Sequence, residues 1–187
     1  LKTERGAQLQ YKIGMLGAGN MAEAIAGALV RAEIVKSPHI LVTDISSERL
    51  DHFQRKHEIG SVADAGKLLQ QCDTIILAVK PQQLLAAVTQ MIETADLANC
   101  KDRRLIISIA AGIRISKLES VVYAGLNESE RQRFPIVRVM PNTPALVLAG
   151  IAGLSGNAYA AAGDLALARR IFEATGQVVD VAEAELD

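Results

Sequence analysis

The sequence predicts an α/β protein with one doubly wound, mostly parallel sheet of about eight strands, flanked by helices. Short apolar runs of strand length alternate with segments of helical period along almost the whole chain, a pattern typical of repeated βα units. The 187 residues are 50% apolar and 22% charged, as expected for an ordinary globular domain. This length is sufficient for one well-buried domain.

The first half of the chain contains four strand–helix repeats. The run TIILAV at residues 74–79 is almost wholly apolar, as expected of a strand covered on both faces. Asp64 is a candidate N-cap for the third helix. We expect strands at 12–16, 40–43, 61–62 and 74–79, and helices at 21–32, 47–57, 65–71 and 83–94.

The second half of the chain continues the same alternation. Ser116 and Glu119 have the Ser-x-x-Glu spacing of a capping box, and Gly176 is placed to end the last helix. The charged run NESERQRF is expected to be a connection. We expect strands at 105–109, 136–140, 150–154 and 177–181, and helices at 117–126 and 159–175.

Composition excludes several classes of function. The net charge is −1, aromatic residues make up 3% and Trp is absent, so neither a basic stripe nor stacking platforms for nucleic acid are present. No run reaches the length of a membrane span, and two cysteines form no disulfide framework. We therefore expect a cytoplasmic protein that binds neither nucleic acid nor membrane, with a flexible extension at 1–10 and a nucleotide-binding domain at 11–187.

Metal-ligating residues are sparse. His52 and His57 are five residues apart, a spacing that takes them off a shared helical face, and Cys72 and Cys100 have no partners at ligand spacing. We expect no metal site.

The turn between the first strand and the first helix has the pattern G-x-G-x-x-A at residues 17–22. In such a turn Gly17 permits the tight bend, Gly19 lets a pyrophosphate approach the backbone, and Ala22 lets the helix pack close to the strand. The N-terminus of the helix supplies N–H groups and a positive dipole end for phosphate. The pattern and its flanks predict a Rossmann-like dinucleotide site.

Asp44 follows the second strand, where an acidic residue reads the adenosine ribose. Its carboxylate can accept both ribose hydroxyls and repel a 2′-phosphate, which favours NAD(H). Ser46, Ser47 and Arg49 follow at once and could instead bind a 2′-phosphate, although Ser47 could equally be an N-cap. Both NAD(H) and NADP(H) therefore remain open.

Three further segments lie at the carboxyl ends of strands, where open α/β sheets bind ligands. These segments are AVKPQ, SIAAGI and VMPNTPA, at residues 78–82, 108–113 and 139–145. Lys80 is a candidate proton donor or edge cation. Asn142 and Thr143, between two prolines, form either a rigid polar corner for substrate or simply a turn.

At these residues the chain resembles Δ1-pyrroline-5-carboxylate reductase. The motifs IGMLGAGNMAEAI, AVKPQ, SIAAGI and RVMPNTPA occur in order, and RVMPNTPA is the most specific. The resemblance implies hydride transfer from NADH or NADPH to the C=N carbon of 1-pyrroline-5-carboxylate, which gives L-proline.

The resemblance also implies roles for individual residues. Asn142 and Thr143 would border the reacting face, where they position substrate and nicotinamide. The cofactor-binding residues would be Leu16, Gly17, Ala18, Gly19, Asn20, Met21, Asp44, Ala78, Val79, Lys80, Pro81, Ile109, Ala110 and Ala111.

The chain departs from this family's pattern in three places. Asp64-Ala65 stands where many members carry an Asn that touches the cofactor, and Leu146 and Leu148 stand where Gly is frequent. The family's helical C-terminal domain, which builds the dimer and most of the imine site, is not expected within these residues. Two alternatives remain: a non-catalytic dinucleotide-binding module, or another reductase of this architecture, such as a 3-hydroxyacid or F420-linked dehydrogenase.

Overall fold

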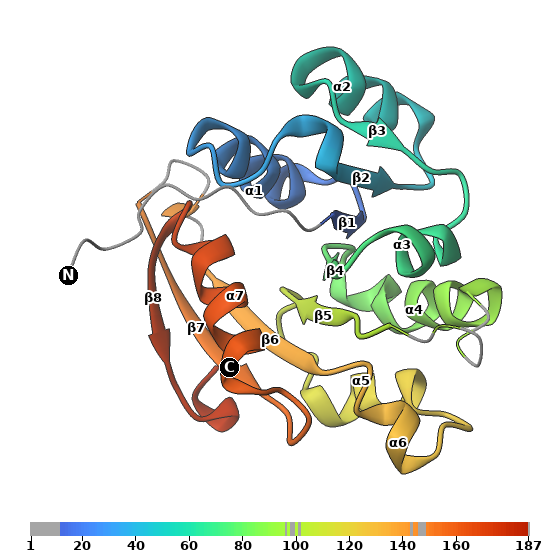
Figure 1. Cartoon of the computed structure of the whole chain (residues 1–187). Coiled ribbons are helices and arrows are strands. Elements are labelled where there is room, and N and C mark those ends of the chain that lie inside the picture. Colours follow the sequence, from blue (N-terminus) through green and yellow to red (C-terminus); the bar gives the residue numbers. More distant parts are fainter. Residues whose placement is uncertain are drawn as a thin grey trace.

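The computed structural model describes residues 12–95, 97, 100, 102–142, 144–145 and 149–186. These residues form an eight-stranded sheet with the order β3-β2-β1-β4-β5-β6-β7-β8 (Figure 1). The strands are β1 (Ile13–Leu16), β2 (Ile40–Thr43), β3 (Gly60–Ser61), β4 (Thr74–Leu77), β5 (Leu105–Ser108), β6 (Ile136–Pro141), β7 (Gly150–Gly156) and β8 (Gly176–Asp180).

Helices connect most of these strands. They are α1 (Asn20–Arg31), α2 (Ser47–His57), α3 (Gly66–Gln71), α4 (Pro81–Ala95), α5 (Ile115–Val122), α6 (Glu128–Arg131) and α7 (Ala162–Phe172). Within the described residues, no helix combines the length and apolar character that crossing a bilayer requires.

The predicted fold class is confirmed, because every strand pair is parallel except β6 with β7. A parallel crossover needs a dozen residues or more. The short segment 142–149 between β6 and β7 is therefore compatible only with an antiparallel neighbour. β8 pairs parallel to β7 after the α7 crossover, so β7 and β8 both run opposite to the first six strands.

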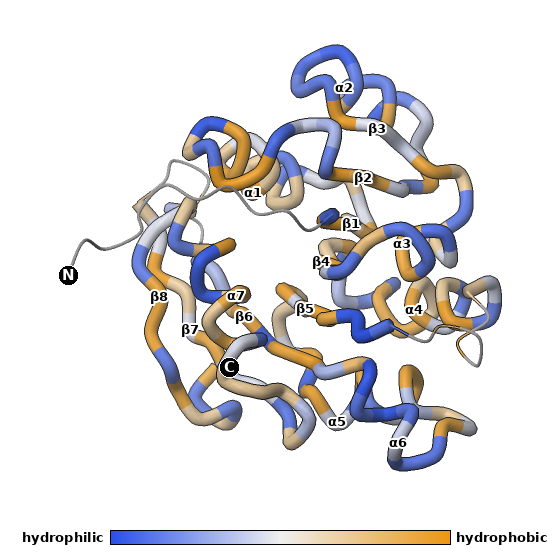
Figure 2. Tube along the Cα trace, viewed as in Figure 1, coloured by the Kyte–Doolittle hydropathy of each residue, from blue (hydrophilic) through white to orange (hydrophobic). Residues whose placement is uncertain are grey.

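The core lies on both faces of the sheet. Helices α1 and α7 cover one face and α3, α4 and α5 cover the other (Figure 1). Side chains of β4 alternate between these layers: Ile76 packs in the α1 layer, whereas Ile75 and Leu77 pack in the α3–α4 layer. Figure 2 shows the resulting pattern, with apolar central strands and polar outer loops.

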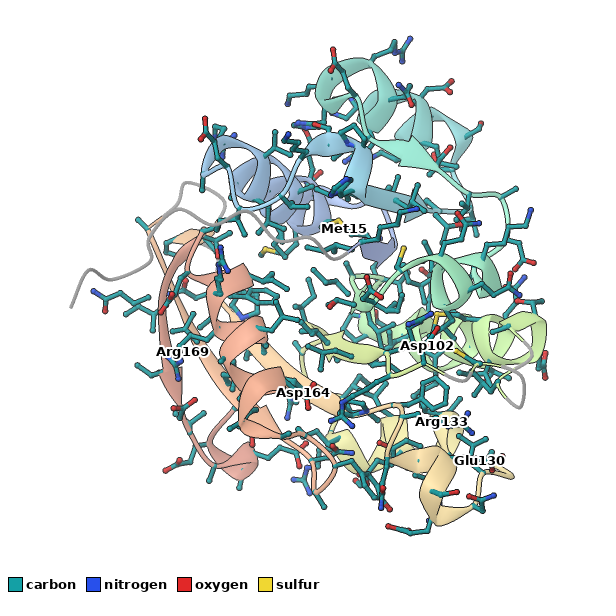
Figure 3. All side chains as sticks on the ribbon, viewed as in Figure 1. Met15, Asp102, Glu130, Arg133, Asp164 and Arg169 are labelled. Atoms are coloured by element: carbon teal, nitrogen blue, oxygen red, sulfur yellow. The ribbon has the colours of Figure 1, made fainter. Side chains whose placement is uncertain are left out.

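Side-chain packing follows the same division. Met15 of β1 is fully buried, and Figure 3 shows it in the interior. Near α6, Glu130 and Arg133 form an ion pair with an N–O distance of 3.7 Å. Charged residues therefore stabilise the periphery, while the central strands are held by apolar contacts.

Three local predictions are wrong. Ser116 lies inside α5, whose N-cap is Arg114, and Glu119 accepts a hydrogen bond from Asn157 rather than closing a capping box. The charged run expected to be a connection contains α6, which Asn127 and Glu130 cap reciprocally. The N-cap of α3 is Ala65, although the carboxylate of Asp64 still accepts the Gly66 N–H at 2.8 Å. Only in α5 do the competing residues, Arg114 and Asn157, lie outside the predicted motif.

Candidate functional site

A cavity of about 850 Å³ opens at the carboxyl ends of β1, β2 and β4. The chain reverses its direction of winding between β1 and β4, and this switch point is where doubly wound sheets bind ligands. The cavity contains half of the residues predicted to bind cofactor: Leu16, Gly17, Gly19, Asp44, Ala78, Val79 and Lys80.

Gly17 is required by the fold itself. Its φ of +106° is rarely adopted by residues with a side chain. A Cβ at this position would lie 2.9 Å from the backbone carbon and oxygen of Ala78. The N–H of Gly17 donates to the carbonyl of Thr43 at 2.8 Å, so the bend also links β1 to β2.

Gly19 is not required by the fold. It is the N-cap of α1, and its φ of −74° suits any residue. No side chain makes a capping hydrogen bond at this end of the helix. A Cβ at Gly19 would meet no atom within 4 Å. The first N–H groups of a helix lack intrahelical partners and favour anions. The open space before α1 therefore fits a phosphate group that approaches the backbone closely.

Asp44 lies at the end of β2 and ties the glycine-rich turn to the start of α2. Its Oδ2 accepts the N–H of Ala18 at 2.6 Å, and its Oδ1 accepts the N–H of Ser46 at 2.9 Å. The next residue, Ile45, is 96% exposed at the cavity rim. This arrangement presents a carboxylate and an apolar side chain together, as a ribose and an adenine ring require.

Two of the three residues considered for a 2′-phosphate, Ser46 and Arg49, make other contacts. Ser46, rather than Ser47, is the N-cap of α2, and its hydroxyl accepts the N–H of Arg49 at 3.4 Å. The guanidinium of Arg49 donates to the carbonyl of Ala18 at 2.7 Å and to the carboxylate of Glu23 at 2.9 Å. Arg49 thus links the glycine-rich turn to the first turn of α1. Lys80 is exposed and is the cation that lines the described cavity.

The remaining predicted residues lie along the same sheet edge but outside this cavity. Ile109, Ala110 and Ala111 follow β5, whose carboxyl end lies beside that of β4. Asn142 follows β6, and its Oδ1 accepts the N–H of Ile151 at 3.0 Å, which commits that oxygen to β7. Four other predicted residues are close in sequence to residues that line the cavity: Ala18, Asn20, Met21 and Pro81. Thr143 lies outside the described residues.

The opposite wall of the cavity was predicted only in part, since the family resemblance marked Asp64-Ala65 as a position near the cofactor but did not mark the α4 residues. It consists of Ala63, Asp64 and Ala65 before α3, together with polar and small residues of α4: Gln83, Ala86, Ala87, Gln90 and Thr94. The α4 residues recur at helical spacing, which was a detectable signal. The Gly66 N–H and the Thr94 hydroxyl hold the pKa of Asp64 below its usual value, so this carboxylate stays ionised at the rim.

Comparisons with known proteins agree with this geometry. The family model described as NADP oxidoreductase, coenzyme F420-dependent, matches residues 12–112. The pyrroline-5-carboxylate reductase of Corynebacterium melassecola is 31% identical over 175 residues, which cover 94% of this chain and 61% of that protein. That of Pseudomonas aeruginosa is 36% identical over 165 residues, covering 88% of this chain and 55% of that protein.

A solved structure shows the same likeness. Plasmodium falciparum pyrroline carboxylate reductase with NADP bound matches with a TM-score of 0.77 and 27% identity, covering 96% of this chain and 61% of that one. The resemblance predicted from the four motifs is therefore confirmed. The chain spans about three fifths of the length of the curated relatives it matches.

Proposed function

The chain belongs to the family described as NADP oxidoreductase, coenzyme F420-dependent, and we propose that it is the cofactor-binding part of an NAD(P)H-dependent reductase. The reaction is reduction of the C=N bond of 1-pyrroline-5-carboxylate to L-proline. The open space at Gly19, before the N-terminus of α1, is the observation that carries the proposal. The relatives' names supply the substrate.

Different residues along the carboxyl edge of the sheet bind different parts of the dinucleotide. Leu16–Met21 hold the pyrophosphate at the N-terminus of α1, and Asp44 accepts the hydroxyls of the adenosine ribose. Ile45 and the α4 wall enclose the adenine. Ala78–Pro81 and Ile109–Ala111 line the second ribose and the nicotinamide.

The reaction requires the protein mainly to position the cofactor and the substrate. A bound reduced nicotinamide would supply the hydride to the carbon of the protonated imine, whose nitrogen keeps its proton in the product. The small residues after β4 and β5 leave room for a flat ring. Asn142 borders the reacting face, where its Nδ2 can donate and its Oδ1, which already accepts the Ile151 N–H, has a second lone pair. Thr143 is assigned to the same face from the family resemblance. Holding the reactants about 3–3.5 Å apart and excluding water supplies the catalytic advantage.

We further propose that the imine site and a homo-oligomeric interface are completed by chain beyond these residues. The proposal is supported by the matched relatives, of which this chain spans about three fifths. Substrate reduction therefore depends on more than the cofactor site described here.

The test is a titration of the chain with NADH and with NADPH, followed by nicotinamide fluorescence, with 1-pyrroline-5-carboxylate then added. We expect saturable binding of at least one nucleotide and little turnover by this chain. Turnover would place the complete imine site within these residues. Binding of neither nucleotide would contradict the proposal. If a longer form of the protein reduced oxidised coenzyme F420 but did not reduce the imine, the F420-linked alternative would be favoured.

A further inference from the structure

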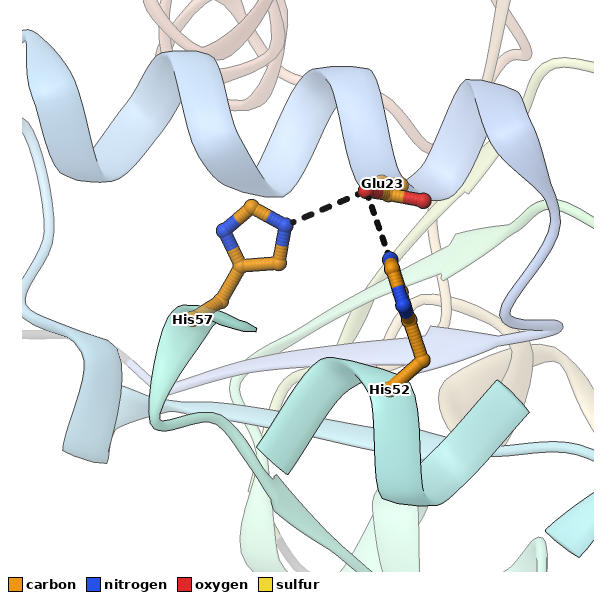
Figure 4. Close-up of side chains that lie close together, drawn as sticks. All are labelled: Glu23, His52 and His57. Atoms are coloured by element: carbon orange, nitrogen blue, oxygen red, sulfur yellow. Dashed lines mark hydrogen bonds and ion pairs between the residues drawn. The ribbon is translucent and has the colours of Figure 1, made fainter. Parts of the chain in front are cut away.

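Two histidines and a carboxylate converge on the side of the molecule where α2 packs against α1. Glu23 lies in the first turn of α1, His52 lies within α2, and His57 is its last residue. His52 Nε2 lies 2.9 Å and His57 Nε2 lies 3.4 Å from Glu23 Oε1 (Figure 4). Among the described residues, Glu23, His52 and His57 are the one group of three potential metal ligands whose donor atoms all lie within 4.8 Å of one another. The spacing argument that separated the two histidines is wrong here, because Glu23 reaches both from another helix.

The separations suit direct coordination. Around a tetrahedral ion with bonds of about 2.0–2.1 Å, neighbouring ligand atoms lie about 3.3–3.4 Å apart. The 3.4 Å separation of Glu23 Oε1 from His57 Nε2 matches this value, and the 2.9 Å separation from His52 Nε2 needs to lengthen by only a few tenths of an ångström. Two imidazoles and one carboxylate are the donors that Zn²⁺ and related transition-metal ions take, whereas Mg²⁺ and Ca²⁺ prefer oxygen ligands alone.

The ligands are held in place yet reachable. The side chains of Glu23 and His57 are 17% and 13% exposed, whereas that of His52 is 36% exposed and leaves a path from solvent. The ring of His57 packs on Phe53 with centroids 5.9 Å apart. A Cβ at Gly27 of α1 would lie 3.4 Å from His57 Cε1, an ordinary van der Waals contact, so the imidazole lies directly against α1.

Two cations complete the cluster and have different roles. Arg49 binds the second oxygen of Glu23 at 2.9 Å and the carbonyl of Ala18, so it orients the carboxylate from outside, as partners of metal ligands do. Lys56 Nζ donates to Glu23 Oε1 at 2.7 Å, and its side chain is 58% exposed. Lys56 therefore competes with an ion for Oε1, and it can swing into solvent.

The carboxylate of Glu23 has donor groups on both of its oxygens. Oε2 contacts Arg49, and Oε1 contacts Lys56 and the two imidazoles. A carboxylate ligates a metal in its ionised form.

We propose that Glu23, His52 and His57 form a binding site for one divalent transition-metal ion of the zinc class, with Lys56 leaving Glu23 when the ion binds. The site lies outside the dinucleotide cavity. Solvent supplies the remaining coordination position, as in zinc sites with three protein ligands. This inference is independent of the proposed reductase activity.

The test is calorimetric titration of the untagged chain with Zn²⁺ at neutral pH, repeated with Co²⁺ and visible absorption. We expect one bound ion, and a Co²⁺ spectrum of low coordination number. His52→Ala and His57→Ala should each weaken affinity about tenfold or more. Lys56→Met should strengthen it, because a competitor for Oε1 and a positive charge are removed.

His39→Ala is the matched control, since His39 lies in the turn Ser37–His39, away from the cluster. Its affinity for Zn²⁺ should equal that of the wild type. Zn²⁺ should also raise the melting temperature of wild type and His39→Ala but not of His52→Ala. His52 is sufficiently exposed for its replacement to leave the fold intact. Absence of Zn²⁺ binding by the wild type, or binding that survives both histidine substitutions, would overturn the proposal.

Discussion

The carboxylate of Asp44 binds two backbone N–H groups and also faces the cavity. It fixes Ala18 in the glycine-rich turn, fixes Ser46 at the start of α2, and borders the cavity. Each carboxylate oxygen has a second lone-pair direction. Asp44 can therefore accept ribose hydroxyls while it keeps both backbone contacts, and its charge opposes a 2′-phosphate.

Asp44→Ala should raise the affinity for NADPH relative to NADH by about tenfold, or ~1.4 kcal/mol. Both affinities should fall somewhat, because the turn loses two hydrogen bonds. Asp44→Asn is the matched variant, since it removes the charge and retains an acceptor. Fluorescence titration with both nucleotides measures the ratio. An unchanged ratio in both variants would mean that Asp44 does not read the ribose.

Cys72 is a buried thiol against β1 and α3. Burial is the main cause that raises its pKa from 9.0 to about 12. Because the folded pKa is raised, the protonated thiol contributes its full stability below about pH 9, and this contribution is lost as the pH rises towards 12. At pH 8 a maleimide should label half-buried Cys100 far faster than Cys72.

Cys100→Ser provides the control for this labelling experiment. In that variant, labelling should become fast only when denaturant unfolds the chain. Rapid labelling of Cys72 in the folded variant would show that the thiol is accessible and contradict the packing described here.

Some site residues could be found from the sequence and others could not. Gly17, Gly19 and Asp44 were predicted because a local motif and strand order fix their positions. Asp64 and Thr94 were not assigned to the wall, because their proximity depends on how closely α3 approaches the end of α4. A Cβ at Gly66 would lie 2.6 Å from the backbone carbon of Thr94. That approach is a packing result, which periodicity does not encode.

At the scale of elements, most strands and helices could be predicted because apolar period and turn residues agree. The bounds of β2 and α2 match the predicted ranges. The start of helices was less predictable, since several Ser, Asp and Asn residues compete to cap them. The antiparallel pairing of β7 required the length of the β6–β7 connection, which the alternating pattern does not reveal.

The N-terminus of α2 provides a test at this scale. Ser46→Ala should destabilise the protein by about 0.5–1 kcal/mol, because its hydroxyl caps the Arg49 N–H. Ser47→Ala is the matched control, and it should be neutral or slightly stabilising, since Ser47 is exposed inside the helix. Urea denaturation measures the free energy of unfolding of both variants. The opposite ranking would make Ser47 the cap.

At the scale of the whole molecule, the strand order places the candidate residues that the structure describes along the carboxyl edge of the sheet. β2, β1, β4, β5 and β6 are adjacent and parallel, so their carboxyl ends form a continuous row. That row runs from Asp44, the proposed adenosine contact, to Asn142 at the proposed reacting face. The two glycines at its centre differ: the fold requires Gly17, whereas Gly19 leaves space before α1.

The central claim is that a dinucleotide phosphate occupies the space at Gly19. The most direct measurement is calorimetric titration of NADH and NADPH into the wild type and Gly19→Val, with thermal melting of each, and with Gly17→Ala for comparison. We predict that Gly19→Val weakens nucleotide binding more than about tenfold, or ~1.4 kcal/mol, and melts close to the wild type. Gly17→Ala should instead lose about 1–3 kcal/mol of stability from its strained backbone. Unchanged nucleotide affinity in Gly19→Val would contradict the account.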